Sequence, residues 1–161
     1  MILLRSTTMP TLRFTYDQAP DVVYALLSDS ATVQARSEAF GDTSIDVSST
    51  GTTVTNTREV LAEVPPFAKR FLAPRNRVTD TKTWDPEARK ARMTVSIPSA
   101  RTTITGDVAI EARGTGSSYV VTFAVKCEIP LIGGQLEKHI TRLTEEGMQR
   151  EHAWNRRRLG S

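Results

Sequence analysis

The sequence IPLIGGQLEKHITRLTEEGMQREHAW, residues 129–154, decides the fold because it predicts the longest helix in the chain. On a helical wheel its apolar residues and one glycine fall in a single narrow stripe, which consists of Ile132, Leu136, Ile140, Leu143, Gly147 and Trp154. Polar and charged residues occupy the other faces. Such a helix is stable mainly when its apolar stripe packs against another layer of structure, and that layer must come from the residues upstream.

The upstream residues predict one strand, two short helices and then about six more strands. The segment TLRFTYD, residues 11–17, alternates apolar and polar residues, which is the pattern of a strand with one buried face. Pro20 suits the first turn of a helix, and Asp29 with Ser30 ends that helix and caps a second one. Patterns of period two then dominate up to the long helix, interrupted once by a segment that contains two prolines.

This order predicts an α+β fold in which a curved antiparallel sheet of about seven strands wraps around the C-terminal helix. A chain of 161 residues suffices for one sizeable core. We expect a single domain over residues 10–159, preceded by a disordered tail over residues 1–9.

Composition restricts the classes of function. A hydrophobic content of 39% with 24% charged residues is ordinary for a globular protein. The net charge is only +3 and no broad basic stripe is interleaved with aromatics, so nucleic-acid binding is not expected. Cys127 is the only cysteine, which excludes an intrachain disulfide, and the first residues are too few and too polar for a signal peptide. We therefore expect a cytoplasmic protein.

Two local patterns carry a family resemblance. VVYALLSD follows the first strand, and IPLIGGQLEKHI opens the last helix. With this order of elements the chain resembles the START-like or helix-grip superfamily of lipid-transfer proteins, plant pollen allergens and polyketide cyclases. Two further patterns, in which each dash stands for one or two other residues, are PL-GG-LEK at residues 130–138 and VP-F-RF at residues 64–71. They make the chain resemble one actinobacterial branch of the superfamily, and this resemblance implies no activity. What the superfamily implies is a helix-grip fold with a cavity between sheet and long helix that holds an apolar or amphipathic small molecule.

The glycines around the long helix have two interpretations each. Gly133 and Gly134 form either a backbone nest for a carboxylate or phosphate, or a tight turn where the helix base lies close to the sheet. No lysine or hydroxyl residue completes a phosphate loop, which favours the packing interpretation. Gly147 costs about 1 kcal/mol relative to alanine. Its missing side chain makes room either for a ligand or for a bulky sheet residue such as Trp84.

Strand parity and the helix stripe together predict which residues would line a cavity. The predicted lining consists of Arg58, Trp84, Met93, Val95, Ile97, Val108, Tyr119, Val121, Phe123, Leu136, Ile140, Leu143, Gly147 and Glu151. Arg58 shares the parity of Val54 and Val60, and an inward arginine would need a carboxylate from the protein or a ligand. In the alternative, which is slightly favoured, Leu61 and the neighbouring threonines face inward and Arg58 faces water.

Few side chains offer catalytic chemistry. His139 and His152 lie thirteen residues apart on the helix, on different faces, with His152 directed away from the stripe, so they form no metal site. Cys127 has inward parity near His139, but a role as a small buried hydrophobe is favoured over a nucleophile. Glu151 and Arg150 mark either a cavity mouth or a helix that emerges into solvent, and the second is favoured. We expect no catalytic residue, metal or cofactor.

The proline-containing interruption forms a flap, residues 65–75, with Phe67, Phe71 and Leu72 beside basic residues. Such a flap would contact an anionic membrane transiently or close over a cavity. The favoured alternative docks its phenylalanines into the core.

The leading hypothesis is a non-catalytic protein that binds or transports a hydrophobic small molecule, such as a lipid, fatty acid or polyketide-like compound. One alternative is a cyclase or aromatase-type enzyme that uses cavity tyrosines, arginines or acids for proton transfer. The other is an interaction module with a filled core. The sequence does not predict the ligand or the oligomeric state.

Overall fold

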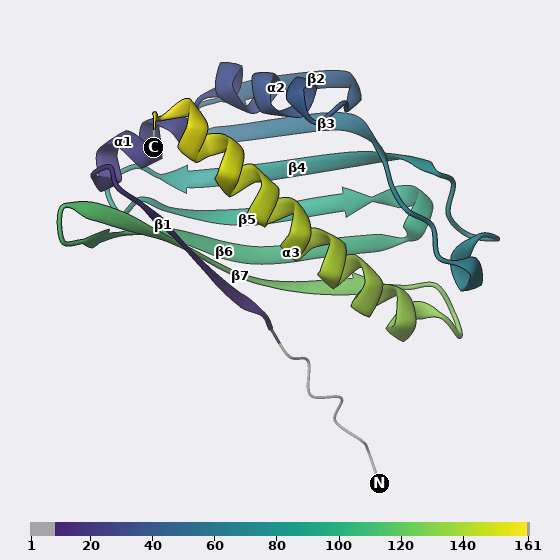
Figure 1. The fold of residues 1–161 in the computed structure, drawn as a ribbon. Helices are drawn as coiled ribbons and strands as arrows, with labels where there is room; N and C mark the ends of the chain where they lie inside the picture. Colours follow the sequence, from purple (N-terminus) through teal and green to yellow (C-terminus); the bar gives the residue numbers. More distant parts are fainter. Residues whose placement is uncertain (1–8, 161) are drawn as a thin grey trace, which may run out of the picture.

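The computed structural model describes residues 9–160, which form one seven-stranded antiparallel sheet with helices packed against it (Figure 1). The elements are β1 (Thr11–Tyr16), α1 (Pro20–Leu27), α2 (Ser30–Ala39), β2 (Thr43–Thr50), β3 (Thr53–Leu61), the short 3₁₀ turn η1 (Pro66–Ala68), β4 (Arg75–Asp85), β5 (Lys90–Ile97), the 3₁₀ turn η2 (Pro98–Ala100), β6 (Thr102–Arg113), β7 (Gly116–Cys127) and α3 (Gly133–Arg158). Of the predicted tail at residues 1–9, all but Met9 lies outside the described residues.

The sheet is a meander to which the first strand adds one edge. Strands β2 to β7 pair in sequence order, and β1 pairs with β7, which gives the order β1-β7-β6-β5-β4-β3-β2. All neighbouring strands are antiparallel. The predicted α+β fold, with about seven strands, two short helices after the first strand and a long C-terminal helix, is confirmed.

Local sequence signals set the helix starts. Pro20 occupies the first turn of α1, and the Asp29 side chain accepts a hydrogen bond from the Thr32 backbone N–H at 3.0 Å as the N-cap of α2. At the start of α3, a Cβ on Gly133 would lie 2.9 Å from the Cys127 carbonyl oxygen. Gly133 therefore allows the helix base to pack on the end of β7, which is the favoured packing interpretation.

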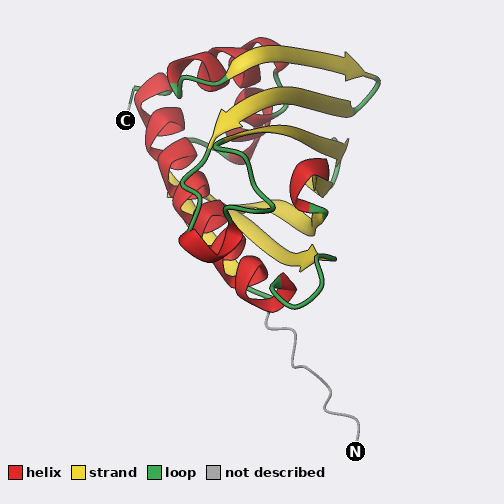
Figure 2. Ribbon diagram, turned by 90° about the vertical axis from the view of Figure 1, so that its right-hand side faces the viewer, coloured by secondary structure: helices red, strands yellow, loops and turns green. Residues whose placement is uncertain are grey.

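The long helix packs unevenly on the sheet. Helix α3 contacts β7 and β1, whereas α2 contacts β2 and β3 at the opposite edge. Figure 2 shows α3 running along one side of the sheet while the strands curve. The region under α3 and α1 is solid: its fully buried side chains include Val108, Val121, Phe123 and Leu136. Farther from β7, over β3 to β5, the sheet curves away from α3, and a cavity lies in that part.

Candidate functional site

A cavity of about 260 Å³ lies between α3, α2 and the concave face of strands β3 to β5. Its apolar lining includes Leu27, Val33, Val54, Val60, Val78, Met93, Val95, Ile97 and Ile104, with Ile140, Leu143 and Met148 from α3. Its polar lining includes Tyr16, Arg36, Ser37, Asp42, Asn56, Arg58, Asn76, Asp80, Lys82, Glu151, His152 and Asn155. The cavity is thus apolar over much of its wall and strongly polar near α2, the C-terminal half of α3 and parts of β3 and β4.

Most of the residues predicted to line a cavity border this one. They are Arg58, Trp84, Met93, Val95, Ile97, Tyr119, Ile140, Leu143, Gly147 and Glu151, joined by Leu72 of the flap. The remaining four, Val108, Val121, Phe123 and Leu136, are core residues instead. They share the inward parity of their elements, but helices cover them directly and leave no space: α3 and α1 contact β7, which carries Val121 and Phe123, and α1 contacts β6, which carries Val108.

Gly147 faces open space. A Cβ built on this residue would meet no heavy atom within 4 Å among the described residues, apart from its immediate neighbours and the helix backbone. Trp84 therefore does not fill the position left by the missing side chain. Of the two interpretations of this glycine, the structure retains the one in which it enlarges a cavity.

Arg58 points inward, so the slightly favoured outward orientation was wrong. Val54 and Asn56, which share its parity, are buried, whereas Leu61 is 68% exposed. The Arg58 Nε donates to Asp42 Oδ2 at 3.2 Å, and the two side chains are only 15% and 11% exposed. Burial raises the pKa of Asp42 above its ordinary value, and the nearby Arg58 opposes that shift only in part. The carboxylate that an inward arginine requires is supplied by the protein.

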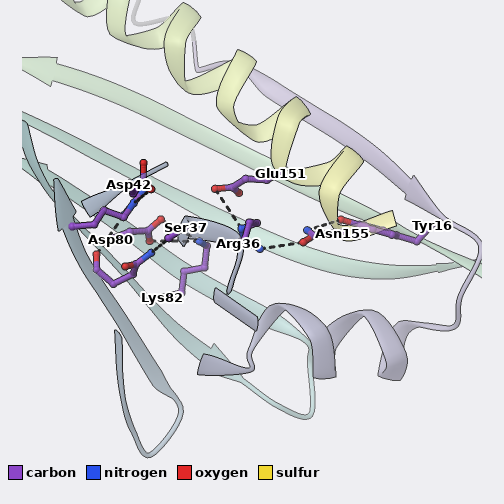
Figure 3. Close-up of polar contacts among 10 residues, drawn as sticks. Tyr16, Arg36, Ser37, Asp42, Asp80, Lys82, Glu151 and Asn155 are labelled. Carbon is purple, nitrogen blue, oxygen red and sulfur yellow. Dashed lines mark hydrogen bonds and ion pairs between the residues drawn. The ribbon is translucent and has the colours of Figure 1, made fainter. Parts of the chain in front are cut away.

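A second polar group gathers at the end of the cavity nearest α1. Arg36, which is 7% exposed, donates from Nη1 to Asn155 Oδ1 at 3.2 Å, and Asn155 Nδ2 donates to the Tyr16 hydroxyl at 3.2 Å. The Arg36 Nε lies 3.9 Å from Glu151 Oε1. Figure 3 shows these side chains directed toward one another from β1, α2 and α3. The expectation that the helix emerges into solvent at Glu151 was wrong, since α3 stays packed against Arg36 and Tyr16 there.

Two further residues of α3 differ from prediction. His152 is not directed away from the interior: its ring lies 4.7 Å from that of Tyr16 and 5.0 Å from that of Phe14, between centroids. Burial lowers the pKa of His152, so the imidazole is neutral near pH 7. Asn155, rather than Trp154, ends the inward stripe, and Trp154 instead lies under the Arg158 guanidinium.

Burial also raises the pKa of both cavity tyrosines, Tyr16 and Tyr119. For Tyr16 the hydrogen bond from Asn155 opposes the effect of burial. For Tyr119 the charge of Glu151 adds to it. Both phenols are therefore protonated at neutral pH and act there as neutral hydrogen-bonding groups.

Two contacts tie α3 to the rim of the cavity. His139 Nε2 lies 3.1 Å from the carbonyl oxygen of Glu63, two residues before the flap. The Arg150 guanidinium lies 4.6 Å from the centre of the Phe40 ring, at the end of α2. Cys127 makes neither contact: its Sγ donates to the Ala100 carbonyl oxygen at 3.4 Å, consistent with the favoured structural role.

The flap does not dock its phenylalanines. Phe67 and Phe71 are 40% and 44% exposed, and the residue that the η1 turn buries is Ala68. Leu72 borders the cavity. The favoured prediction of docked phenylalanines was therefore wrong, because the 3₁₀ turn places Ala68 inward and Phe67 outward, and Phe71 is exposed in the turn that follows.

Sequence reasoning missed the contribution of α2 and the ion pair on β4. Arg36 and Ser37 come from a ten-residue helix whose polar composition shows no clear inward face. Asp80 and Lys82, 3.3 Å apart, share the parity of the correctly predicted Trp84, which is the signal that could have found them.

Within residues 9–160, no group of three or more histidine, cysteine, aspartate or glutamate side chains could hold a metal ion. No helix in that part of the chain is both long and apolar enough to cross a bilayer.

Comparison with known proteins identifies the family. The model of a family described as "Protein of unknown function (DUF2505)" matches residues 11–159, so the chain belongs to this family. No curated protein matches the sequence. The predicted origin in an actinobacterial branch stays a prediction.

Solved structures confirm the fold. A protein from Thermus thermophilus superposes with a TM-score of 0.70 at 18% identity, over 96% of this chain and 99% of that one. The Zhui aromatase/cyclase of a Streptomyces species gives 0.61 at 12% identity, over 91% and 90%. A norcoclaurine synthase point mutant from Thalictrum flavum, in complex with a transition state analogue, gives 0.64 at 11% identity, over 97% and 99%. The resemblance to the START-like, helix-grip superfamily is thereby confirmed at the level of fold.

Proposed function

We propose that this protein binds a hydrophobic small molecule in the cavity between the sheet and α3. The observation that carries the proposal is the open space of about 260 Å³ beside Gly147. A glycine within a helix lowers stability by about 1 kcal/mol relative to alanine. Since no described side chain occupies the space that Gly147 leaves, room for a ligand is the compensating gain.

The volume limits the size of the ligand. Binding sites for drug-sized molecules span about 300–1,000 Å³, and this cavity is slightly smaller. A compound of up to about three rings or one short acyl chain suits such a site better than a two-chain lipid. Among lipids, fatty acids and polyketide-like compounds, a polyketide-like molecule or a short fatty acid therefore fits best.

The proposal is tested by two measurements. Native mass spectrometry of the purified protein should show a co-purifying small molecule, and the uncharged methyl ester of a fluorescent short-chain fatty acid should bind saturably at one site. Gly147→Leu places a side chain in the cavity and should weaken probe binding at least tenfold. Gln149→Leu, on the exposed side of the same helix, is the matched control and should leave binding unchanged. No co-purifying molecule together with no saturable binding would refute the proposal.

A second candidate function is a proton-transfer enzyme of the cyclase or aromatase type, since Tyr16, Arg36 and Glu151 converge on the cavity. The measurement is deuterium exchange at the α-carbon of an uncharged two-ring ketone such as 2-tetralone, followed by NMR. Exchange faster than in buffer, and slower in Glu151→Gln, would favour the enzyme. Exchange at the buffer rate would leave the binding protein as the better proposal.

The exposed phenylalanines of the flap support transient contact with an anionic membrane during ligand delivery. Phe67 and Phe71 stand beside Lys69 and Arg70, a combination that suits an anionic interface. Flotation with phosphatidylglycerol vesicles should recover the protein, and the double variant Phe67→Ser/Phe71→Ser should lose that recovery. Equal flotation of both forms would exclude the flap as the contact. A cytoplasmic location, which the single cysteine favours, is part of the same proposal.

A further inference from the structure

The charges in the cavity wall are balanced by the protein itself. The lining holds four basic side chains, Arg36, Arg58, Lys82 and Arg150, and four carboxylates, Asp42, Glu63, Asp80 and Glu151. Three of the basic groups have a carboxylate within 4 Å: Arg36 with Glu151 at 3.9 Å, Arg58 with Asp42 at 3.2 Å and Lys82 with Asp80 at 3.3 Å. The fourth, Arg150, lies over the Phe40 ring and is exposed at the rim.

This balance disfavours an anionic ligand. A carboxylate that enters the cavity loses its hydration and would have to displace Asp42, Asp80 or Glu151 from an existing ion pair. Displacement would leave the protein carboxylate unpaired in a partly buried site. An exposed arginine at the rim compensates little, because water screens such a contact.

Polar atoms without partners in the same wall point to a ligand that forms hydrogen bonds. Trp84 is 3% exposed and Asn56 is 6% exposed, and both border the cavity. Among the described residues, Trp84 Nε1 and Asn56 Oδ1 are buried and have no hydrogen-bond partner. An unsatisfied buried donor or acceptor costs about 1–3 kcal/mol. Neither atom has appreciable surface open to the cavity that its residue borders, so each is a candidate for a ligand contact that forms when the neighbouring side chains shift.

The chemistry of these two atoms selects the ligand group. Trp84 Nε1 is a donor only and requires an acceptor. Asn56 Nδ2 donates to Ser37 Oγ at 3.0 Å, which leaves Oδ1 to accept. If the amide were turned over, the Ser37 hydroxyl would donate instead and the amide nitrogen would be the free group. A hydroxyl satisfies either orientation, because it both donates and accepts.

We propose that the ligand is an uncharged, hydroxyl-bearing hydrophobic compound, with an oxygen that accepts from Trp84 Nε1 and a hydroxyl that pairs with Asn56. This inference rests on the proposed function and narrows it: a fatty acid, whose carboxylate is ionised at neutral pH, would be a poor ligand. The wall thus selects by charge as well as by size.

A matched series of two-ring compounds tests the inference by calorimetric titration at pH 7.5. The series is 2,7-dihydroxynaphthalene, naphthalene and 2-naphthoate. The dihydroxy compound should bind roughly three- to tenfold more tightly than naphthalene, since each new hydrogen bond contributes modestly. It should bind at least tenfold more tightly than 2-naphthoate, whose charge must be buried.

Variants of the two tryptophans locate the contact. Trp84→Phe keeps an aromatic ring but removes the N–H, and it should reduce the preference for the dihydroxy compound over naphthalene roughly three- to tenfold. Trp154→Phe, which lies outside the cavity, is the control and should keep the preference. Circular dichroism establishes that both variants are folded, and naphthalene affinity reports whether the cavity persists.

Each other outcome overturns the inference. Equal or tighter binding of 2-naphthoate would show that the cavity accepts anions, and it would leave the proposed function standing. An unchanged preference in Trp84→Phe would remove Trp84 from the contact. If no member of the series binds while the fluorescent probe of the proposed function does, the inference fails alone; if neither binds and no ligand co-purifies, both fail.

Discussion

The exchange Gly147→Ala separates an open cavity from a packed interior by the sign of its effect on stability. A methyl group at this position meets no heavy atom within 4 Å, so it introduces no clash and gains no packing. What remains is the backbone term, because alanine is about 1 kcal/mol more favourable than glycine inside a helix. The free energy of unfolding should rise by about 1 kcal/mol, which corresponds to an increase in Tm of about 2–4 °C for a chain of this length.

The same helix supplies the matched control. Gly133→Ala is the identical chemical change in α3, but its Cβ would lie 2.9 Å from the Cys127 carbonyl oxygen. Relief of that contact requires the helix base to shift away from β7. We expect a loss of about 1–3 kcal/mol, the usual range for overpacking. The two alanine variants should therefore move the free energy of unfolding in opposite directions.

Urea denaturation followed by circular dichroism measures both variants against the unaltered chain without added ligand. An apolar compound that co-purifies must be removed first, since a bound ligand raises the apparent stability and would mask the backbone term. A loss of stability in Gly147→Ala would refute the reasoning, because it would mean that another group occupies the space beside Gly147.

Three further changes test other parts of the site. Asp42→Ala leaves the mostly buried Arg58 guanidinium unpaired and should lower the free energy of unfolding by about 3 kcal/mol. The double variant Asp42→Ala/Arg58→Met should regain most of that stability in the same urea assay. Equal losses in the two variants would show that the ion pair is not responsible. Burial lowers the pKa of His152, so as the pH falls below about 6.5 the unfolded chain takes up a proton before the folded protein does. Urea titrations between about pH 5 and 8 should therefore show a loss of stability on acidification, and this loss should be smaller in His152→Gln. An identical pH dependence in both proteins would contradict this reasoning. Leu136→Ala, in the solid core, should lower the free energy of unfolding by about 2–5 kcal/mol. Leu143→Ala, beside the cavity, should lower it less, because part of the Leu143 side chain already faces open space. Similar losses in the two variants would argue against the cavity.

The fold could be predicted because its signals are local and repeated. Period-two patterns mark each strand, Pro20 and Asp29 mark helix starts, and one apolar stripe marks α3. None of these signals depends on knowing what lies across the molecule. The element order then restricts the topology, because sequential strands usually pair and a single long amphipathic helix has only the sheet to cover.

The site was predictable only where one element decides the orientation. Met93, Val95 and Ile97 are apolar and alternate, so their inward direction follows from β5 alone. Arg58 is different, since its orientation depends on whether a carboxylate lies within reach, and Asp42 is brought there by the turn from α2 into β2. Likewise, the burial of His152 depends on β1 passing beneath the end of α3, which helical periodicity does not reveal.

The features that reduce stability collect at one place in the molecule. Gly147 weakens the middle of α3, Trp84 and Asn56 bury polar atoms without partners, and Arg36 is held almost out of contact with water. Where α3 covers β7 the packing is dense, with Leu136 and Phe123 fully buried. The molecule therefore has a well-packed region where α3 covers β7, and a region around the cavity where several independent features lower the stability of the fold. Marginally stable proteins seldom retain several such features together unless function requires them. A ligand that fills the space beside Gly147 and hydrogen-bonds to Trp84 and Asn56 would offset three of them at once, while the ion pairs stay intact.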